Sequence, residues 1–288
     1  MSLTTSAKRE AFRKLHESGC FVLPNPWDVG SAKILQHLGF KALASTSAGM
    51  AWALGRADGE VSLDEVLLHL SSLAHATDLP LNADFENGFA DDPREVARNV
   101  ALAVDTGVCG LSIEDTLLPV PFGAPDKPQL LSIEEGVGKM RAALAGRQDK
   151  RLVIAGRTSA IGITGLADTI ARAKAYEAAG VDAFFVAGAK TRAEVEAVSA
   201  AIRIPLVLGT PAPELQDLAY LGAQRVRICI QGHLPIAAAM RAVYDTMKAL
   251  REGMRPKDVP GIASPELMKR VTRDAAYRRA IRDYLGGA

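Results

Sequence analysis

Short apolar runs alternate with amphipathic segments of ten to fifteen residues along most of the chain, and eight such pairs can be counted. This alternation is typical of βα units built around a parallel sheet, because each amphipathic helix buries one face against the strands that it connects. We expect eight strands at residues 21–24, 42–45, 81–84, 110–114, 152–157, 183–186, 206–209 and 225–230. No other feature restricts the possible folds as strongly.

The segments between the expected strands have helical periodicity. In 93–106, 133–144, 167–179 and 192–201, apolar residues recur at spacings of three and four, which places them on one face of a helix. Several helices are followed by a glycine just before the next strand, and we expect these glycines to end the helices in the left-handed conformation. They are Gly39, Gly107, Gly180 and Gly222.

Eight βα units favour a closed (β/α)8 TIM-type barrel, because closure leaves no strand edge exposed. A doubly wound open sheet is the structural alternative. We expect a single domain over residues 1–288, in which 234–252 form the last barrel helix. Pro256 and Pro260 interrupt the chain after it. Residues 255–288 are therefore predicted to form a C-terminal helical extension that a barrel does not require and that serves docking or exchange between subunits.

Composition excludes several classes of partner. The net charge is +1 and the basic residues are scattered, so we expect no nucleic-acid partner and no acidic membrane surface. The N-terminal segment has no apolar core, and no stretch approaches about 18 consecutive apolar residues, so we expect a soluble cytoplasmic protein. The three cysteines lack metal-ligand spacing and are predicted to be packing residues.

Acidic residues gather where the expected strands end. Asp84 and Glu86 close the third strand, Glu114 closes the fourth, and Asp58 lies in the loop after the second. The C-terminal ends of barrel strands meet at one mouth, and carboxylates suit Mg²⁺, with Mn²⁺ as a possible substitute. The alternative is that such acids only cap helices, as Asp92 before a proline does. Capping does not explain acids inside strand ends, so we favour a metal site.

Other polar residues are expected at the same mouth. Ser45, Thr46 and Ser47 follow the second strand, and Arg157 ends the fifth, where its guanidinium can hold a substrate carboxylate or pair internally with one of the acids. His233 follows the eighth strand. From its position alone it can donate to a substrate carboxylate, relay a proton, or simply pack or cap a helix.

Two other chemistries lack their residues. Neither G-x-G-x-x-G nor the Walker pattern occurs, which disfavours nucleotide binding. No lysine ends an expected strand, so Schiff-base catalysis has no nucleophile. The electrophilic role is therefore left to a metal ion.

Several segments together resemble the isocitrate lyase and phosphoenolpyruvate mutase superfamily, over essentially the whole length. They are NPWDVGSAKILQHLGFKALASTSAG, LGRAD ending at Asp58, NADFENGFADDP with Asp84 and Glu86, SIEDTLLP with Glu114, and AGRTSA with Arg157. The resemblance implies a barrel whose last helices are exchanged between subunits, giving a homo-oligomer, commonly a tetramer built as a dimer of helix-swapped dimers.

The resemblance also implies roles for the mouth residues. Asp84 would bind Mg²⁺ directly, and Asp58, Glu86 and Glu114 would hold its waters. Many relatives have Asp where this chain has Glu86, but the longer acid should still reach a metal-bound water. Ser45, Thr46 and Ser47 would present backbone donors to a 2-oxo acid that Arg157 grips.

The loop at 116–131 bears on the subfamily, because isocitrate and methylisocitrate lyases carry a Lys-(Lys or Arg)-Cys-Gly-His signature there. This loop has no cysteine and no histidine, which disfavours both activities because they need the thiol as an acid. Phosphonate mutases place a lysine and an asparagine in it, and only Lys127 is present here. The stretches IEDTLLPVPFG, EEGVGKMRAAL and QGHLPIAAAMRAVYD are most similar to the oxaloacetate decarboxylase branch, in which a histidine equivalent to His233 contacts substrate.

We therefore expect a Mg²⁺-dependent carbon–carbon lyase that decarboxylates oxaloacetate to pyruvate through an enolate, with Arg157 and His233 as its catalytic residues. One alternative is another C–C or C–P cleavage on the same scaffold, of the methylisocitrate lyase, phosphonopyruvate hydrolase or mutase, or acylpyruvate hydrolase type. The other is a non-catalytic barrel that binds a 2-oxo acid.

Overall fold

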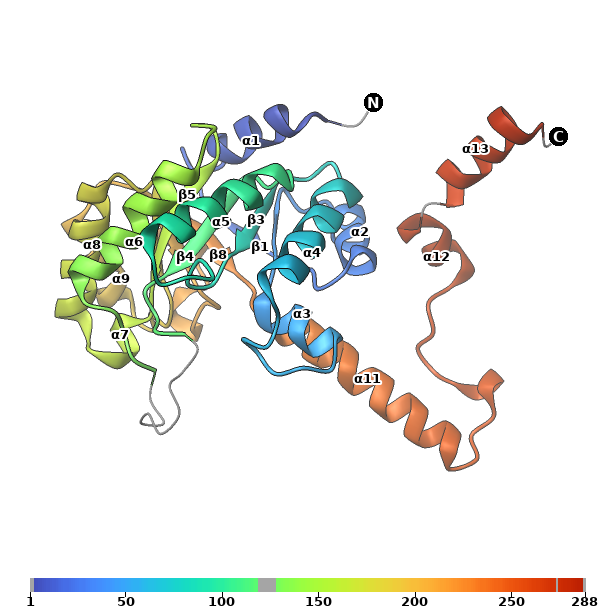
Figure 1. The fold of residues 1–288 in the computed structure, drawn as a ribbon. Coiled ribbons are helices and arrows are strands. Elements are labelled where there is room, and N and C mark those ends of the chain that lie inside the picture. The colour runs from blue at the N-terminus through green and yellow to red at the C-terminus, as the bar shows by residue number, and fades with distance from the viewer. Residues whose placement is uncertain (1–2, 119–127, 273, 287–288) are drawn as a thin grey trace.

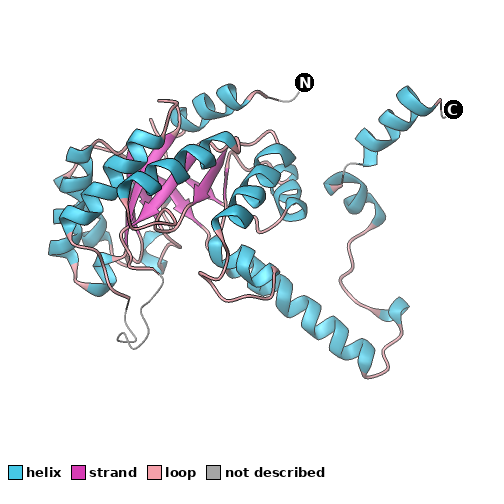
Figure 2. Ribbon diagram, viewed as in Figure 1, coloured by secondary structure: helices cyan, strands magenta, loops and turns pink. Residues whose placement is uncertain are grey.

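Eight parallel strands form one sheet in a computed structural model that describes residues 3–118, 128–272 and 274–286 (Figures 1 and 2). The order is β1-β8-β7-β6-β5-β4-β3-β2. The strands are β1 Phe21–Leu23, β2 Leu43–Ala44, β3 Leu81–Asp84, β4 Gly110–Glu114, β5 Val153–Thr158, β6 Ala183–Val186, β7 Leu206–Leu208 and β8 Val226–Ile230. The expected (β/α)8 TIM-type architecture is confirmed, and the open doubly wound sheet is excluded.

The barrel closes between β1 and β2 through individual hydrogen bonds instead of a ladder. Ala44 N donates to Pro24 O at 3.0 Å. The Asn25 side chain donates to Ala44 O at 3.3 Å and Ser45 O at 3.1 Å, and it accepts from Gly232 N at 2.8 Å. One amide thus joins the ends of β1 and β2 and the loop after β8, beside the mouth of the barrel.

Helices surround the strands. They are α1 Thr5–Lys14, α2 Val29–His37, α3 Ser47–Ala53, α4 Leu63–Ala76, α5 Pro93–Asp105, α6 Ile133–Gly146, α7 Ala160–Ile163, α8 Leu166–Ala179, α9 Arg192–Ala201, α10 Leu218–Ala223 and α11 Leu234–Arg251. Short 3₁₀ turns lie at Pro213–Leu215 and Pro256–Asp258. The helices predicted at 93–106, 133–144, 167–179 and 192–201 correspond to α5, α6, α8 and α9 within two residues at each end.

Helix ends follow local chemistry. Asp92 accepts from Arg94 N at 2.7 Å, with Pro93 in the first turn, as expected for the start of α5. Gly39, Gly107 and Gly180 have φ values of 82°, 93° and 101°, which confirms their left-handed conformation. The prediction for Gly222 is wrong. It lies inside α10, and Arg225 takes the left-handed position with φ 58°.

The core has two layers. Inside the barrel, apolar side chains from the strands meet Phe12 of α1, which is 1% exposed and fills the N-terminal end of the barrel. A larger layer lies between strands and helices and includes Tyr176, Phe184 and Met140. In Figure 1, α1 covers the end of the barrel opposite α3, α7 and the start of α11. We call the end under α1 the base and the other end the mouth.

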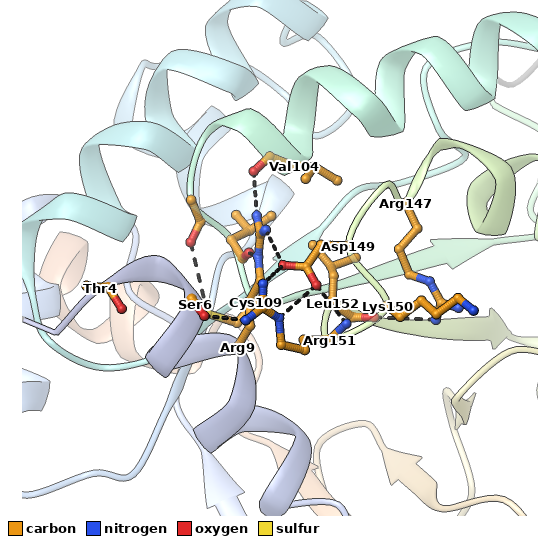
Figure 3. A network of polar contacts seen from close by, with 12 residues as sticks. Thr4, Ser6, Arg9, Val104, Cys109, Arg147, Asp149, Lys150, Arg151 and Leu152 are labelled. Atoms are coloured by element: carbon orange, nitrogen blue, oxygen red, sulfur yellow. Dashed lines mark hydrogen bonds and ion pairs between the residues drawn. The ribbon is translucent and has the colours of Figure 1, made fainter.

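A polar network ties α1 to the base (Figure 3). Arg9 donates to Val104 O at 2.6 Å and Val108 O at 3.0 Å and forms an ion pair with Asp149 at 2.9 Å. Arg151 also pairs with Asp149, at 2.9 Å. Arg9 is 8% exposed, so its charge is compensated without help from bulk water.

The C-terminal part leaves the barrel as an arm, defined here as α11 with α12 Pro265–Val271 and α13 Asp274–Leu285 (Figure 1). Ile236 is the buried side chain of α11, and α12 and α13 have none among their described residues. The C-terminal segment predicted to be helical contains two short helices, α12 and α13. Assignment of 255–288 as an extension of a single domain stays a prediction.

No helix among the described residues combines the length and apolarity needed to cross a bilayer.

Candidate active site

A cavity of about 330 Å³ lies at the mouth, where the strands end. Seven of the nine predicted site residues line it. They are Ser45, Thr46, Ser47, Asp58, Asp84, Arg157 and His233. The wall formed after β6, β7 and β8 has small residues, Ala187, Gly188, Gly209 and Gly232. The cavity therefore has a charged half and a half in which little side-chain volume competes with a ligand.

Arg157 lies between two acids. Its Nη1 is 2.9 Å from Asp84 Oδ1, and its Nε is 3.0 Å from Glu114 Oε2, although that Nε–H makes no hydrogen bond of good geometry. Burial disfavours the charge on Arg157, but the surrounding acids, with Asp84 and Glu114 contributing most, together raise its pKa. The internal ion pair considered from the sequence is thus formed, at the edge of the cavity.

Asp84 is oriented by the segment after β2. Its backbone N–H donates to Ser45 Oγ at 2.9 Å, and Ser47 Oγ and Ser47 N donate to its Oδ2 at 3.2 and 3.4 Å. The Ser45 N–H donates to Asn82 O at 2.9 Å within the sheet. Ser45 therefore orients Asp84 through its hydroxyl, and its own amide is already engaged.

Glu86 lies beside this cavity, in a strained turn. It lines a neighbouring cavity of about 610 Å³, together with Asp58 and Phe89. Glu86 and Phe89 have φ values of 44° and 56°, a region that non-glycine residues rarely adopt and that is held only where surrounding structure enforces it. Burial, with the charges of Asp84, Asp58 and Glu114, raises the pKa of Glu86 to about 8.

Two buried side chains of the helix layer hold that turn. Lys139 of α6 is 3% exposed, and its Nζ donates to Asn87 O at 2.7 Å. Asn99 of α5 donates to Gly88 O at 3.0 Å. Burial lowers the pKa of Lys139. Neither residue was singled out from the sequence, because a helical lysine or asparagine normally faces solvent.

Glu114 and its neighbour Asp115 have different surroundings. Glu114 does not line the cavity. It is 7% exposed behind Arg157, and burial raises its pKa in spite of Arg157. Asp115 is fully buried and accepts from Tyr176 Oη at 2.7 Å and Arg172 Nη1 at 2.9 Å. Asp115 thus anchors β4 to α8, away from the cavity.

His233 is held by the helix that follows β2. Its Nδ1 lies 2.7 Å from Thr46 Oγ1, and its ring meets Trp52 edge-on with centroids 5.6 Å apart. His233 precedes α11, but its side chain makes no capping hydrogen bond. The capping alternative considered for this histidine is therefore not seen.

The charge at the mouth suits a cation. Four carboxylates, Asp58, Asp84, Glu86 and Glu114, surround the single guanidinium of Arg157, and the pKa values of Glu86 and Glu114 are raised. Within the described ranges, no three acidic, histidine or cysteine side chains are placed to ligate one ion directly. This arrangement fits an ion that takes one or two protein ligands and keeps its waters, as Mg²⁺ does.

The stem of the loop after β4 forms a small antiparallel bridge. Thr116 pairs with Leu130, and Leu117 N donates to Gln129 O at 2.8 Å. Residues 119–127, including Lys127 and most of the predicted subfamily loop, lie outside the described part of the chain.

Comparison with known proteins gives two consistent findings. Residues 12–251 match the family model described as phosphoenolpyruvate phosphomutase. The chain is 45% identical over 287 residues to an oxaloacetate decarboxylase of Bradyrhizobium sp. (strain ORS 278), which covers 99% of each chain.

Two solved structures share the fold over nearly all of this chain. A complex of oxaloacetate acetylhydrolase with the inhibitor 3,3-difluorooxalacetate has a TM-score of 0.84 at 26% identity and covers 98% of both chains. A phosphonopyruvate hydrolase complex with oxalate and Mg²⁺ has a TM-score of 0.84 at 26% identity, covering 98% of this chain and 100% of that one.

Proposed function

Because the chain belongs to the phosphoenolpyruvate mutase and isocitrate lyase superfamily, we propose that it is a carboxy-lyase that converts oxaloacetate to pyruvate and carbon dioxide. The observation that carries the proposal is the cavity in which Asp84, Arg157 and His233 meet. It combines an acidic cation site with two donors for carboxylates. Full-length similarity to oxaloacetate decarboxylases supports the same reaction.

The reaction breaks the bond between C3 and C4 of oxaloacetate. The C4 carboxylate leaves as carbon dioxide, and its bonding electrons pass to C3 and the C2 oxygen to give the enolate of pyruvate. A proton then adds at C3. Because the leaving carboxylate is already ionised, this step needs neither a thiol acid nor a strong base, which agrees with a loop that contains no cysteine or histidine.

Arg157 and His233 orient the substrate in this proposal. The ion pairs of Arg157 use Nη1 and Nε, and a guanidinium has five N–H donors, so donors remain for a substrate carboxylate. His233 lies on the same cavity wall as Gly232, where there is room for the leaving group. Together they hold the C4 carboxylate out of the carbonyl plane, so that the breaking bond overlaps the π system.

A divalent cation, Mg²⁺ or alternatively Mn²⁺, would be held by Asp84 directly and by Asp58, Glu86 and Glu114 through waters. Such an ion supplies Lewis-acid stabilisation of the negative charge that develops on the keto oxygen. Ser47 contributes by orienting Asp84 through its hydroxyl.

Steady-state assays with Mg²⁺ and oxaloacetate, phosphonopyruvate or acylpyruvates test the reaction. We expect oxaloacetate to be consumed with release of pyruvate and carbon dioxide. Oxalate and acetate as products would identify hydrolysis of another bond instead. Turnover no faster than that of free Mg²⁺, together with tight oxaloacetate binding, would favour a non-catalytic barrel and contradict the proposal.

We further propose that the arm joins copies of this chain into a homo-oligomer. Val243, Tyr244 and Met247 of α11 are 63%, 62% and 59% exposed, which is unfavourable for apolar side chains unless another surface covers them. Light scattering during size-exclusion chromatography should show a dimer or a tetramer. A variant that combines Val243→Ser, Tyr244→Ser and Met247→Ser should assemble less well. A wild-type chain that is monomeric at all concentrations would contradict exchange of the arm.

A further inference from the structure

His233 is held by two residues of one short segment. Thr46 is the N-cap residue of α3 and contacts His233 Nδ1 at 2.7 Å, and Trp52 of α3 packs edge-on against the imidazole ring. Because Nδ1 is engaged by Thr46, the nitrogen left for a ligand in the cavity is Nε2. The state of the ring therefore depends on which of the two atoms in the Thr46 contact provides the hydrogen.

Hydrogen-bond accounting at Thr46 answers that question. Thr46 Oγ1 already accepts from Gly49 N at 3.1 Å, the bond that caps α3. A hydroxyl has a single proton to donate, and because Thr46 is only 2% exposed at the cavity wall, a protein acceptor within reach is favoured for this proton. His233 Nδ1 is that partner. If Nδ1 carried the proton instead, the buried hydroxyl would accept twice and its own hydrogen would lose this acceptor, which is unfavourable.

We propose that Thr46 is a positioning residue that fixes His233 as the neutral Nε2–H tautomer, so that the imidazole offers the cavity an uncharged hydrogen-bond donor. The kinetic consequence rests on the proposed decarboxylation. Charge-assisted hydrogen bonds are the stronger ones, so an imidazolium would stabilise the leaving carboxylate more than the transition state in which its charge departs. A neutral N–H orients that carboxylate and holds its charge less tightly.

Gly49 is part of the same arrangement. A Cβ at this position would lie 2.5 Å from Thr46 Cγ2, closer than carbon atoms can approach. The absence of a side chain at Gly49 thus permits the Thr46 rotamer that reaches both Gly49 N and His233. This dependence provides a test in which a clash is introduced and then removed.

Two-bond ¹H–¹⁵N correlation spectra of the full, metal-free chain labelled in its five histidines read the tautomer directly. The His233→Gln variant identifies the signals of His233. We expect the Nε2–H pattern in the wild type and in Thr46→Ser, and a mixture of tautomers in Thr46→Val, which has no hydroxyl. An Nδ1–H pattern in the wild type, or an unchanged pattern in Thr46→Val, would overturn the proposal.

Two further comparisons separate positioning from loss of a helix cap. Gly49→Ala should disturb the tautomer, and the double variant Gly49→Ala with Thr46→Ser, which lacks the clashing methyl, should restore it. Ser62→Ala removes the N-cap of α4 and should leave the His233 spectrum and the activity unchanged. If the double variant folds but does not regain the wild-type tautomer of His233, that result would count against the role of the Thr46 hydroxyl.

Kinetics distinguish this inference from the proposed reaction. With oxaloacetate, Thr46→Val should lose roughly tenfold in kcat/KM, as expected for one misdirected hydrogen bond, whereas Thr46→Ser should retain most of it. A wild type that shows the Nε2–H tautomer but does not decarboxylate oxaloacetate would refute the proposed function and leave the tautomer assignment standing. A wild type that decarboxylates oxaloacetate normally but shows the Nδ1–H tautomer would refute the tautomer assignment and leave the proposed function standing.

Discussion

At the base of the barrel each buried cation faces a carboxylate or a carbonyl, whereas at the mouth four carboxylates surround one guanidinium. Lys8 donates to Ala74 O at 2.9 Å, and Arg9 pairs with Asp149 and two carbonyls. Hydrogen bonds from Arg151 and Arg9 lower the pKa of Asp149. The charges of the base thus stabilise the fold without a ligand.

The mouth has the opposite electrostatic character. Burial and mutual repulsion raise the pKa values of Glu86 and Glu114, although Arg157 lies between the acids. Acids with perturbed pKa values beside a cavity are typical of functional sites. The difference teaches that charge at the base contributes to stability, whereas the clustered acids at the mouth are suited to binding a cation. Four predictions test this division, from the largest expected effect to the smallest.

Asp84→Asn should reduce kcat/KM for oxaloacetate on the order of 10²- to 10³-fold, because it removes the charge proposed to bind the cation. Its thermal unfolding midpoint should change little. Asp149→Asn makes the same chemical change at the base and should lower the unfolding midpoint while kcat/KM is preserved. If both variants lost activity equally, the two ends would not differ in the way described.

Arg9→Met should lower the free energy of unfolding by about 1–3 kcal/mol, because it removes the side-chain donor of two buried carbonyls and one of the two arginine partners of Asp149. Urea titration measures this loss. Lys14→Met removes an exposed ion pair with Glu10 from the same helix and should change stability by less than about 0.5 kcal/mol. A stable Arg9→Met variant would show that the network at the base is dispensable.

Lys139→Met should weaken Mn²⁺ binding roughly tenfold, as found for groups that orient metal-binding side chains. The substitution removes the donor to Asn87 O and so releases the strained turn that carries Glu86. Titration calorimetry on the chain without substrate gives the affinity. Lys174→Met, on the exposed side of α8, serves as the control. Unaltered Mn²⁺ affinity in Lys139→Met would mean that the turn is held by other contacts.

The pH dependence of stability should differ in sign between the two ends. Glu86 has a folded pKa of about 8, above its ordinary value of 4.5, so its contribution is present below pH 4.5 and is lost as pH rises through 8. Asp149 has a lowered pKa, so its contribution is lost as pH falls below its ordinary 3.8. The unfolding midpoint of the metal-free chain should therefore decrease both at alkaline pH and at acid pH.

Variants of Glu86 and Asp149 show which residue causes the decrease of the unfolding midpoint at alkaline pH and which causes the decrease at acid pH. Glu86→Gln should flatten the alkaline slope by a few degrees and leave the acid slope unchanged, and Asp149→Asn should do the reverse. Saturating Mg²⁺ should also flatten the alkaline slope, because the cation compensates the charge that deprotonation adds. An alkaline slope that persists in Glu86→Gln would have to arise from another group.

The sequence predicted the location of the mouth residues because a parallel barrel brings all strand ends to one side. Asp84 and Arg157 come from strands separated by β4, yet lie 2.9 Å apart. Their roles in the reaction remain predictions. The strands of the barrel were predicted to within one or two residues, since apolar runs and capping residues act locally.

Contacts across long sequence distances could not be predicted in this way. Thr46 and His233 are 187 positions apart in the sequence, and neither residue type indicates that the other is its partner. The strained turn at Glu86 contains a non-glycine residue in a conformation that local preference opposes, and tertiary contacts from Lys139 enforce it. The error at Gly222 is a local one, because α10 continues to Ala223 and Arg225 takes the left-handed position in place of the glycine.

The helix that leaves the barrel starts at the residue after His233, and Ile236, in its first turn, is its buried side chain. The imidazole therefore lies directly before a long helix whose other end extends away from the barrel. We therefore expect a tether, a fused domain or an immobilising surface at the C-terminus to disturb His233 more than the same attachment at the N-terminus does. The N-terminus lies at the base, where Phe12 and Arg9 anchor α1, at the end of the barrel opposite the reaction centre.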